Sequence, residues 1–204
     1  MDTNTVLKPE DFSAYYEMAA SAGPGKLLLD ALQIIEQAGS TQGLLAVDLG
    51  AGHGKDTAEL LRRHWKVLAI DFSQEGIDIL LKRPEAQTYK ADLETRVSSF
   101  AAAVFADATL VTAMLSLPYC PAEEFAATWQ NVVSGLKPGG YFAGHFFGAE
   151  QYVGMNHVRR HSKEEIEALL VDFEVLRLEE VNQATGVAEN PKYHYFNVIA
   201  RKRQ

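Results

Sequence analysis

The sequence predicts an α/β protein with a Rossmann-like, seven-stranded, mostly parallel sheet, an antiparallel last strand and helices on both faces. Three observations support this fold class. Strand-like and helix-like segments alternate over residues 44–147, which is typical of a parallel sheet with helical crossovers. A glycine-rich turn follows the first apolar strand. The last two β-rich segments, 174–178 and 193–200, have no helix between them, so we expect them to pair antiparallel.

The strands are predicted from short runs of apolar and β-branched residues that are bounded by turn signals. The third of them is short and ends just before Asp92. Ligands of such sheets bind beyond the carboxyl ends of the parallel strands, so the residues after each strand are candidate site residues. The five parallel strands are expected at residues 44–49, 65–70, 88–91, 108–114 and 141–147.

The helices are predicted from apolar residues at helical spacing and from start and stop signals. Gly23-Pro24-Gly25 separates the first two helices, Pro84 follows the fourth, and Lys137-Pro138-Gly139-Gly140 ends the sixth. Ser162 and Glu165 have the spacing of a capping box, in which each side chain accepts from the backbone N–H of the other residue. The expected helices are 10–22, 25–38, 55–63, 74–82, 97–105, 121–136 and 163–172.

The composition is that of one globular domain, and we expect it in the cytoplasm. The chain has 204 residues, of which 47% are hydrophobic and 23% are charged. A net charge of −8 argues against nucleic acid and anionic membranes as partners, because both require clustered Lys and Arg. The sequence has no membrane-spanning run and no signal peptide. The single cysteine, Cys120, excludes an internal disulfide, and no histidine pair has helical metal-site spacing, so no metal is predicted.

We divide this single domain into four parts. They are an N-terminal helical lid over residues 1–38, a nucleoside-binding core over 44–147, a substrate loop over 148–161, and a C-terminal helix with the final two strands over 162–204.

Three glycines stand at alternate positions over residues 50–54, where they allow a tight bend and a close approach of the backbone to a ligand. The turn does not fit the dinucleotide fingerprint, which requires glycine at Lys55. It does not fit a P-loop either, because a P-loop requires glycine at Leu49 and Ser or Thr at Asp56. An ordinary tight turn between a strand and a helix is the alternative interpretation.

Acidic residues surround this turn and indicate the kind of ligand. Asp48 and Asp56 would repel a pyrophosphate, but they suit a zwitterionic, sulfonium-bearing nucleoside without phosphate. Asp71 ends the second strand, where an acid can accept hydrogen bonds from ribose hydroxyls. Its alternative role is to cap the next helix, for which Ser73 is a competing candidate.

Asp92 follows the third predicted strand. Its carboxylate could accept a hydrogen bond from the exocyclic amine of adenine while Leu93 packs on the ring. A helix cap or a surface acid is the alternative interpretation of Asp92.

Taken in order, these motifs resemble those of class I S-adenosylmethionine-dependent methyltransferases. The resemblance is carried by residues 47–54, Asp71, Asp92 and the turn over 135–140, and residues 193–202 resemble the reversed last strand of that family. Within the superfamily the chain is similar to small-molecule methyltransferases of the tellurite-resistance and thiopurine type, through residues 161–165 and 192–200. The resemblance implies S-adenosylmethionine as cofactor and S-adenosylhomocysteine as product.

The resemblance also implies a role for each matching residue. The glycine turn would face the methionine part of the cofactor, Asp71 the ribose and Phe72 one face of the adenine, and residues 114–117 would lie near the methyl group. Tyr15 and Tyr16 would close over the methionine carboxylate, with core packing of an amphipathic helix as the alternative. The implied cofactor-binding residues are Tyr15, Tyr16, Asp48, Gly50, Ala51, Gly52, Gly54, Asp71, Phe72, Ser73, Asp92, Leu93, Met114, Leu115 and Leu117.

The expected methyl acceptor is a small molecule. Ser116-Leu117-Pro118-Tyr119 stands where methyltransferases that act on DNA amines carry Asn- or Asp-Pro-Pro-aromatic, so amines of nucleic acids and proteins are disfavoured as acceptors. A thiolate or a reduced chalcogen oxyanion would need no general base. If a base is used, Tyr119, His157 and His161 are the candidates.

The other candidates for chemistry receive structural interpretations. His145 is expected to be a core residue on the fifth strand, and Cys120 a small packed residue. His194 is expected near the opposite end of the sheet from the site. A nicotinamide-dependent oxidoreductase and a cofactor-binding protein without turnover are the alternative functions, and the sequence does not give the oligomeric state.

Overall fold

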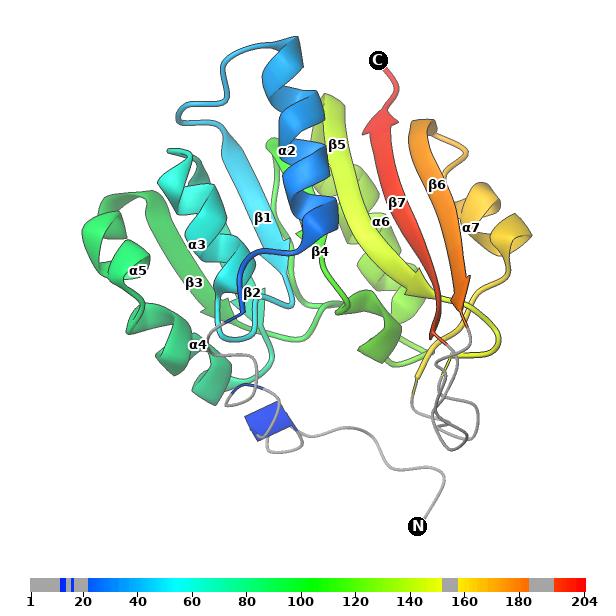
Figure 1. Cartoon of the computed structure of the whole chain (residues 1–204), viewed down its shortest axis with the longest axis horizontal. Helices are drawn as coiled ribbons and strands as arrows, with labels where there is room; N and C mark the ends of the chain where they lie inside the picture. The colour runs from blue at the N-terminus through cyan, green and yellow to red at the C-terminus, as the bar shows by residue number, and fades with distance from the viewer. Residues whose placement is uncertain (1–11, 14–15, 17–21, 152–157, 184–192) are drawn as a thin grey trace.

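The computed structural model describes residues 12–13, 16, 22–151, 158–183 and 193–204. These residues build one seven-stranded sheet with the strand order β3-β2-β1-β4-β5-β7-β6, and helices pack on it (Figure 1). The strands are β1 (Leu45–Leu49), β2 (Lys66–Asp71), β3 (Leu93–Val97), β4 (Ala108–Ala113), β5 (Leu136–Phe147), β6 (Phe173–Gln183) and β7 (Tyr193–Lys202). The helices are α2 (Lys26–Ala38), α3 (Lys55–Arg62), α4 (Gln74–Leu81), α5 (Pro84–Thr88), α6 (Phe125–Gly135) and α7 (Lys163–Leu169).

The direction of the strands confirms the predicted fold class. Strands β3, β2, β1, β4 and β5 pair in parallel, so their carboxyl ends share one edge of the sheet. Strand β7 lies between β5 and β6 and is antiparallel to both. The chain therefore has a mostly parallel, Rossmann-like sheet whose last strand is reversed.

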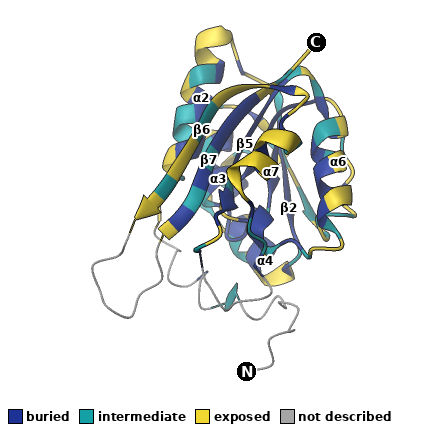
Figure 2. Cartoon of the chain, turned by 90° about the vertical axis from the view of Figure 1, so that its right-hand side faces the viewer, coloured by how far each residue is buried: buried dark blue, intermediate teal, exposed yellow. Residues whose placement is uncertain are grey.

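Two apolar layers cover the two faces of the sheet. On one face, α2 and α3 pack on the sheet through buried residues that include Leu28, Leu32 and Leu61, together with Trp65. On the other face, Trp129 of α6 contacts Phe142 edge-on, with ring centroids 5.1 Å apart. The central strands are buried under both layers, whereas β6 forms an exposed edge (Figure 2). Burial on both faces explains why the central strands have nearly continuous apolar sequences.

The predictions for residues 84–107 are wrong in two places. Residues 84–88 form α5, with Pro84 in its first turn, and a short 3-10 turn over Lys90–Asp92 follows. The third strand therefore begins at Leu93 instead of ending at residue 91. Residues 97–105, where a helix was predicted, contain no helix. The β-branched Thr95 and Val97 fit a strand better than a helix end.

Two other boundaries differ from the prediction. Helix α6 begins at Phe125, after a turn that contains Pro121. Lys137-Pro138-Gly139-Gly140 ends α6 as predicted but already belongs to β5, where Gly139 has a φ of +73°. The register of β4 with β5 shifts beside this segment, between Ala108 and Leu110.

The predicted capping box at the start of α7 is confirmed. The Glu165 N–H donates to Ser162 Oγ at 3.2 Å, and the Ser162 N–H donates to Glu165 Oε2 at 2.8 Å. These bonds satisfy two backbone donors that the first helical turn leaves without partners.

No helix within the described ranges is long and apolar enough to cross a membrane.

Replacing Ser162 with Ala removes the hydroxyl that caps α7. We expect Ser162→Ala to lower the free energy of unfolding by about 1 kcal/mol, measured by urea denaturation. Ser134→Ala is the matched control, since the exposed Ser134 hydroxyl makes only one long bond, 3.5 Å, to Asn131 O. Equal stabilities of Ser162→Ala and Ser134→Ala would show that the capping box contributes nothing.

Candidate functional site

The turn between β1 and α3 is built on three glycines in the left-handed region of the backbone. The φ angles are +83° at Gly50, +52° at Gly52 and +80° at Gly54. Side chains are disfavoured in this conformation, and here there is also no space for them. A Cβ on Gly50 would lie 2.3 Å from Ser116 Cβ, and one on Gly54 would lie 2.5 Å from Leu80 Cγ. Glycine is therefore required at both positions.

Main-chain hydrogen bonds fix this turn against the end of β2. The N–H groups of Gly50 and Ala51 both donate to Ile70 O, at 2.8 and 3.0 Å. The Gly52 N–H donates to Asp71 Oδ2 at 2.7 Å. The strand-end acid is thus part of the turn, as well as a candidate ligand group.

Two backbone donors bond the Asp71 carboxylate. Besides Gly52, the Ser73 N–H donates to its Oδ1 at 2.9 Å, and the Tyr16 hydroxyl lies near the same carboxylate. Burial raises the pKa of Asp71, while its hydrogen bonds lower it. An ionised carboxylate has about four acceptor positions, so two remain for a ligand.

Tyr16 lies directly on the glycine turn. Its ring is 3% exposed, and its Cε1 would be 3.2 Å from a Cβ on Gly52. Its hydroxyl oxygen would be 3.1 Å from a Cβ on Gly76. The described residues of the N-terminal segment therefore cover the turn and the strand-end acid, whereas the predicted site residue Tyr15 lies outside the described residues.

An aromatic cluster continues this cover across the carboxyl edge of the sheet. Phe12 contacts Phe72 and Tyr119 edge-on, with ring centroids 5.4 and 5.5 Å apart. Ser13 Oγ donates to Glu75 Oε2 at 2.5 Å. Phe72, predicted to face adenine, is thus half-buried beside the glycine turn and next to an N-terminal aromatic ring.

Two further buried acids lie beneath the turn. Asp48 Oδ2 accepts from Thr57 Oγ1 at 2.6 Å, and Asp56 Oδ1 accepts from the Gly25 N–H at 2.7 Å. Burial, with the neighbouring charge of Asp56, raises the pKa of Asp48. Burial also raises the pKa of Asp56. This acidic floor opposes a phosphate at the turn, because a further negative charge would be repelled at close range.

The turn after β4 contains a strained residue at the same edge. Leu115 has a φ of +58° and is 42% exposed, and its N–H donates to His145 Nδ1 at 3.2 Å. A non-glycine residue in this region stores strain and persists only where its surroundings hold it, which is common at functional sites. Burial and the charge of Lys55 lower the pKa of His145 to about 4, so the neutral ring accepts this bond at pH 7.

His145 is therefore more than the core residue that the sequence predicted. Asn197 is its partner across the antiparallel pair of β5 and β7. No sequence pattern indicates this role, because it depends on a contact between residues 30 positions apart.

The structure does not bring Asp92 and Leu93 to the site. Leu93 pairs with Val67 at the start of β2, whereas Asp71 at the end of β2 pairs with Val97. Asp92 and Leu93 thus lie at the amino edge of the sheet, and we withdraw them as cofactor residues. The error follows directly from the misplaced third strand.

The residues that follow β3 replace them at the carboxyl edge. The Ser98 N–H donates to Asp71 O at 2.9 Å, and Phe100 Cζ would lie 3.3 Å from a Cβ on Gly50. The run Leu93-Glu94-Thr95-Arg96-Val97, with its β-branched residues, was the signal that could have identified this strand end.

Two other predicted site residues have structural roles. Ser73 is fully buried and caps α4, with its Oγ accepting from the Gly76 N–H at 3.2 Å. Leu117 is 1% exposed and belongs to the apolar core. Met114, by contrast, is half-buried, and its Sδ would lie 3.9 Å from a Cβ on Gly25.

The structure places the three candidate bases in different surroundings. His161 is 3% exposed between Phe125 and Phe146, and its Nε2 accepts from Arg159 Nε at 2.9 Å. Burial and Arg159 lower the pKa of His161 to about 4, so we withdraw it as a base. Tyr119 lies at the carboxyl edge beside Phe147. His157 lies outside the described residues.

The position predicted for His194 is wrong. Because β7 is antiparallel, its first residues lie beside Phe147, at the carboxyl edge. His194 Nδ1 accepts from the Glu150 N–H at 3.1 Å, and its Nε2 lies 2.9 Å from Glu180 Oε1. His194 thus ties the segment after β5 to β6.

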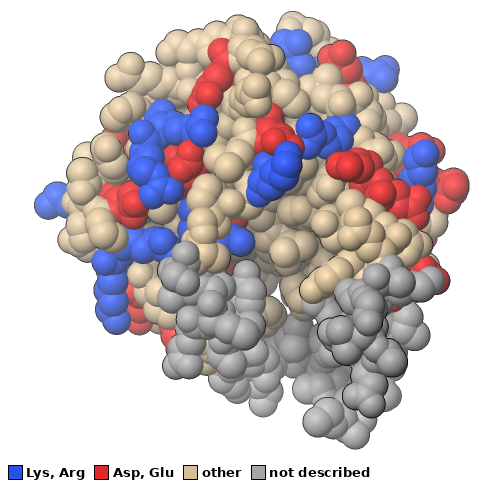
Figure 3. All heavy atoms as spheres, in the orientation of Figure 1, with Lys and Arg blue, Asp and Glu red and all other residues tan. Residues whose placement is uncertain are grey.

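Cys120, possible metal ligands and surface charge are the remaining features that could carry a function. Cys120 is buried and packed, as predicted, with its Sγ 3.3 Å from Thr128 Oγ1, and burial raises the pKa of its thiol. Across the described part of the chain, no three His, Cys, Asp or Glu side chains are placed to hold a metal ion. On the face that Figure 3 shows, Lys and Arg are interspersed with Asp and Glu and form no broad patch of one sign.

One protein family matches part of the chain. Residues 46–140 match the family described as a methyltransferase domain, which confirms the resemblance found in the sequence. No curated protein matches the sequence.

Solved structures share the fold over nearly the whole chain. TehB from Haemophilus influenzae is 17% identical with a TM-score of 0.76, and the match covers 97% of this chain and 68% of that chain. Magnesium protoporphyrin IX methyltransferase from Synechocystis, with S-adenosylhomocysteine bound, is 15% identical with a TM-score of 0.72. That match covers 95% of this chain and 94% of the other. The 1,6-didemethyltoxoflavin N1-methyltransferase of Burkholderia thailandensis is 18% identical with a TM-score of 0.69. That match covers 96% of this chain and 87% of the other.

The raised pKa of Asp48 gives the stability a pH dependence of known sign. The folded state binds this proton more tightly than the unfolded chain, so the contribution of Asp48 to stability is present at low pH and is lost as the pH rises toward the raised value. Asp48→Asn has no such proton. We expect its free energy of unfolding, relative to the natural protein, to be higher at pH 8 than at pH 5 by at least about 1.4 kcal/mol, which corresponds to one pKa unit.

Urea denaturation at the two pH values measures this difference. Asp78→Asn is the control, because Asp78 is exposed on α4 and accepts only from Gln74 Nε2. If Asp48→Asn and Asp78→Asn respond equally to pH, Asp48 is not buried as a charge at pH 8.

Proposed function

We propose that this protein is a methyltransferase that uses S-adenosylmethionine and transfers its methyl group to a small molecule. The observation that carries the proposal is the turn of three left-handed glycines bonded to the strand-end acid Asp71, at the carboxyl edge of the parallel strands. Structural neighbours with S-adenosylhomocysteine bound have the same fold, which supports this choice of cofactor.

The residues at this edge fit such a cofactor. The crowded backbone around Gly50, Gly52 and Gly54 allows close approach where a Cβ would be excluded. When ionised, the acids beneath it, Asp48 and Asp56, suit a cationic amino-acid group and oppose a pyrophosphate, although burial raises the pKa of both. This charge pattern disfavours a nicotinamide dinucleotide, in agreement with Lys55 at the position of its third glycine.

The proposal assigns a role to each retained residue. The backbone of Gly50, Ala51, Gly52 and Gly54 would bind the methionine part, with Asp48 ordering the turn through Thr57. Asp71 would accept from the ribose hydroxyls, and Phe72 would pack on the adenine. Met114 and Leu115 would line the position of the methyl group, with Leu115 held by His145.

The bound cofactor supplies a methyl group that is electrophilic because of the adjacent sulfonium charge. The protein contributes position and exclusion of water, and alignment of two reactants can supply roughly 7–11 kcal/mol. Apolar residues at this edge, such as Leu115 and Phe72, suit a water-poor pocket. Tyr119 is the retained candidate for a base, and a thiolate or a reduced chalcogen oxyanion as acceptor would need none.

Asp71 keeps acceptor positions for the cofactor. Two of about four are taken by the N–H groups of Gly52 and Ser73, which leaves two for ribose hydroxyls. The Tyr16 hydroxyl lies near this carboxylate and competes with a ribose for the free positions. We propose that Tyr16 leaves Asp71 when the cofactor enters.

Calorimetry with S-adenosylhomocysteine tests the proposed function. We expect the natural protein to bind it, and Asp71→Ala to bind at least tenfold more weakly, because a charged acceptor for two hydroxyls is lost. Asp78→Ala, an exposed change on α4, controls for charge, and circular dichroism checks that each variant folds. No binding by the natural protein would refute the function, and unchanged binding by Asp71→Ala would refute the ribose assignment alone.

A second measurement tests the replacement of Tyr16. Tyr16→Phe keeps the ring but removes the competing hydroxyl, so we expect S-adenosylhomocysteine to bind the variant more tightly than the natural protein. Tyr89→Phe, whose ring contacts His64 far from the turn, is the matched control. Weaker binding by Tyr16→Phe would instead mean that the hydroxyl contacts the cofactor.

A further inference from the structure

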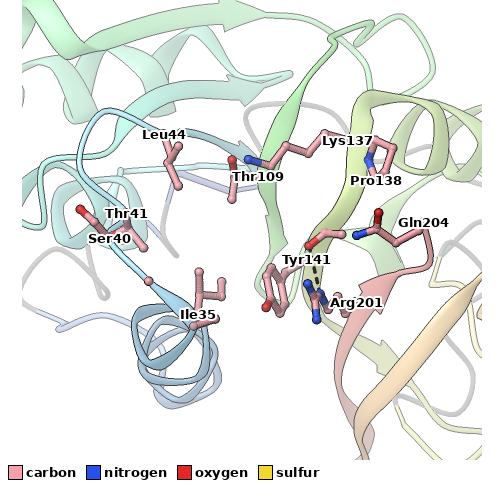
Figure 4. Close-up of a pocket in the computed structure, with 13 residues that line it drawn as sticks. Ile35, Ser40, Thr41, Leu44, Thr109, Lys137, Pro138, Tyr141, Arg201 and Gln204 are labelled. Atoms are coloured by element: carbon pink, nitrogen blue, oxygen red, sulfur yellow. Dashed lines mark hydrogen bonds between the residues drawn. The ribbon is translucent and has the colours of Figure 1, made fainter.

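A pocket of about 250 Å³ lies at the amino edge of the sheet, opposite the glycine turn. It opens between the carboxyl end of α2 and the starts of β4 and β5 (Figure 4). Its lining includes Ile35, Leu44, Thr109, Lys137, Tyr141 and Arg201. None of these residues belongs to the proposed methyltransferase site.

The pocket carries two cations and no acidic side chain. Lys137 and Arg201 line it, and no Asp or Glu does. Arg201 Nε donates only a long bond, 3.4 Å, to Gly139 O, and its guanidinium lies 5.7 Å from the Tyr141 ring centre. Neither cation forms an ion pair with another described residue, whereas Arg62, Arg63, Arg96 and Arg177 all do.

Two negative features adjoin the pocket without neutralising it. Glu174 is the partner of Arg201 across β6 and β7, but it is exposed and does not line the pocket. The carbonyl end of α2 carries about half a negative charge, which the N–H of Gly39 reduces by bonding Glu36 O.

The rest of the lining is apolar with a few hydroxyl groups. Ile35 and Tyr141 are buried and Leu44 is half-buried, so they form an apolar floor. The side chains of Thr41 and Thr109 are also buried, and both residues line the pocket together with Lys137 (Figure 4). Such a lining favours a ligand with an apolar body and one anionic group over an inorganic ion.

We propose that this pocket binds a small organic anion, in which a flat apolar body packs on Tyr141 and Ile35 and a carboxylate or phosphate group contacts Lys137 and Arg201. Thr109 lies near the start of β4 and Leu115 beyond its end, so the two sites are separated by the length of that strand, about 20 Å. The pocket can therefore be filled together with the cofactor site, and the proposal does not depend on the methyltransferase function.

Benzoate is the first probe, and benzamide is its neutral analogue of the same shape. We expect benzoate to bind with a dissociation constant of about 1 mM, and benzamide at least tenfold more weakly, measured by titration of amide chemical shifts in heteronuclear NMR. The shifts should change at Thr41, Thr109 and Lys137 and stay constant at Gly52. Because the cations are partly exposed, the affinity should fall with added salt.

Two variants and a control locate the site. Lys137→Met and Arg201→Met should each weaken benzoate binding about tenfold, and the double variant should abolish it. Lys66→Met is the control, because Lys66 is an exposed lysine at the same edge of the sheet but outside the pocket. Thermal denaturation of each variant confirms that it folds.

Four results would overturn the proposal. Equal affinity for benzamide and benzoate would show that the pocket does not distinguish an anion from a neutral ligand of the same shape. Benzoate binding that survives in the double variant would show that the anion binds elsewhere. Inorganic phosphate that binds as tightly as benzoate would refute the apolar part of the ligand. Failure to bind benzoate up to about ten times the expected dissociation constant would refute the site altogether.

Discussion

The carboxylate of Asp71 is the contact on which the candidate site depends. It ends β2, yet it accepts from Gly52 in the turn after β1 and from Ser73 at the start of α4. One side chain thus fixes two connections at the carboxyl edge. Asp71 has to be charged or strongly polar to hold two backbone donors, although burial disfavours that charge. The same group is therefore both the structural centre of the edge and its natural acceptor for a polar ligand.

The site is assembled at some cost to stability. Asp48 and Asp56 are buried close together, Leu115 is held in the left-handed region, and three glycines allow a turn that no other residue fits. Each of these features opposes folding, and each lies at the carboxyl edge. The apolar layers on the two faces of the sheet offset them. This concentration of unfavourable features at one edge supports a functional interpretation of the edge more strongly than any single residue does.

Because the last strand is reversed, it places polar side chains of different function at the two edges of the sheet. Because β7 is antiparallel, it starts at the carboxyl edge with His194, which joins the segment after β5 to β6. It ends at the amino edge with Arg201, in the pocket below β4 and β5. A parallel last strand would exchange these two residues. One topological feature thus supplies a structural link beside the candidate cofactor site and a cation to the separate pocket.

The sequence alone determined the fold class, the glycine turn and the acid after β2, because these depend on local patterns: alternating elements, missing side chains and a strand end. It failed where the outcome depended on register or long-range contact. Asp92 was assigned to the carboxyl edge because the third strand was placed a few residues too early, which moved the residue to the other end of the sheet. Only the tertiary structure decided that His145 holds Leu115, that Tyr16 packs on the glycine turn, and that His161 is packed between aromatic rings. These pairings join residues far apart in the chain, and no local spacing encodes them.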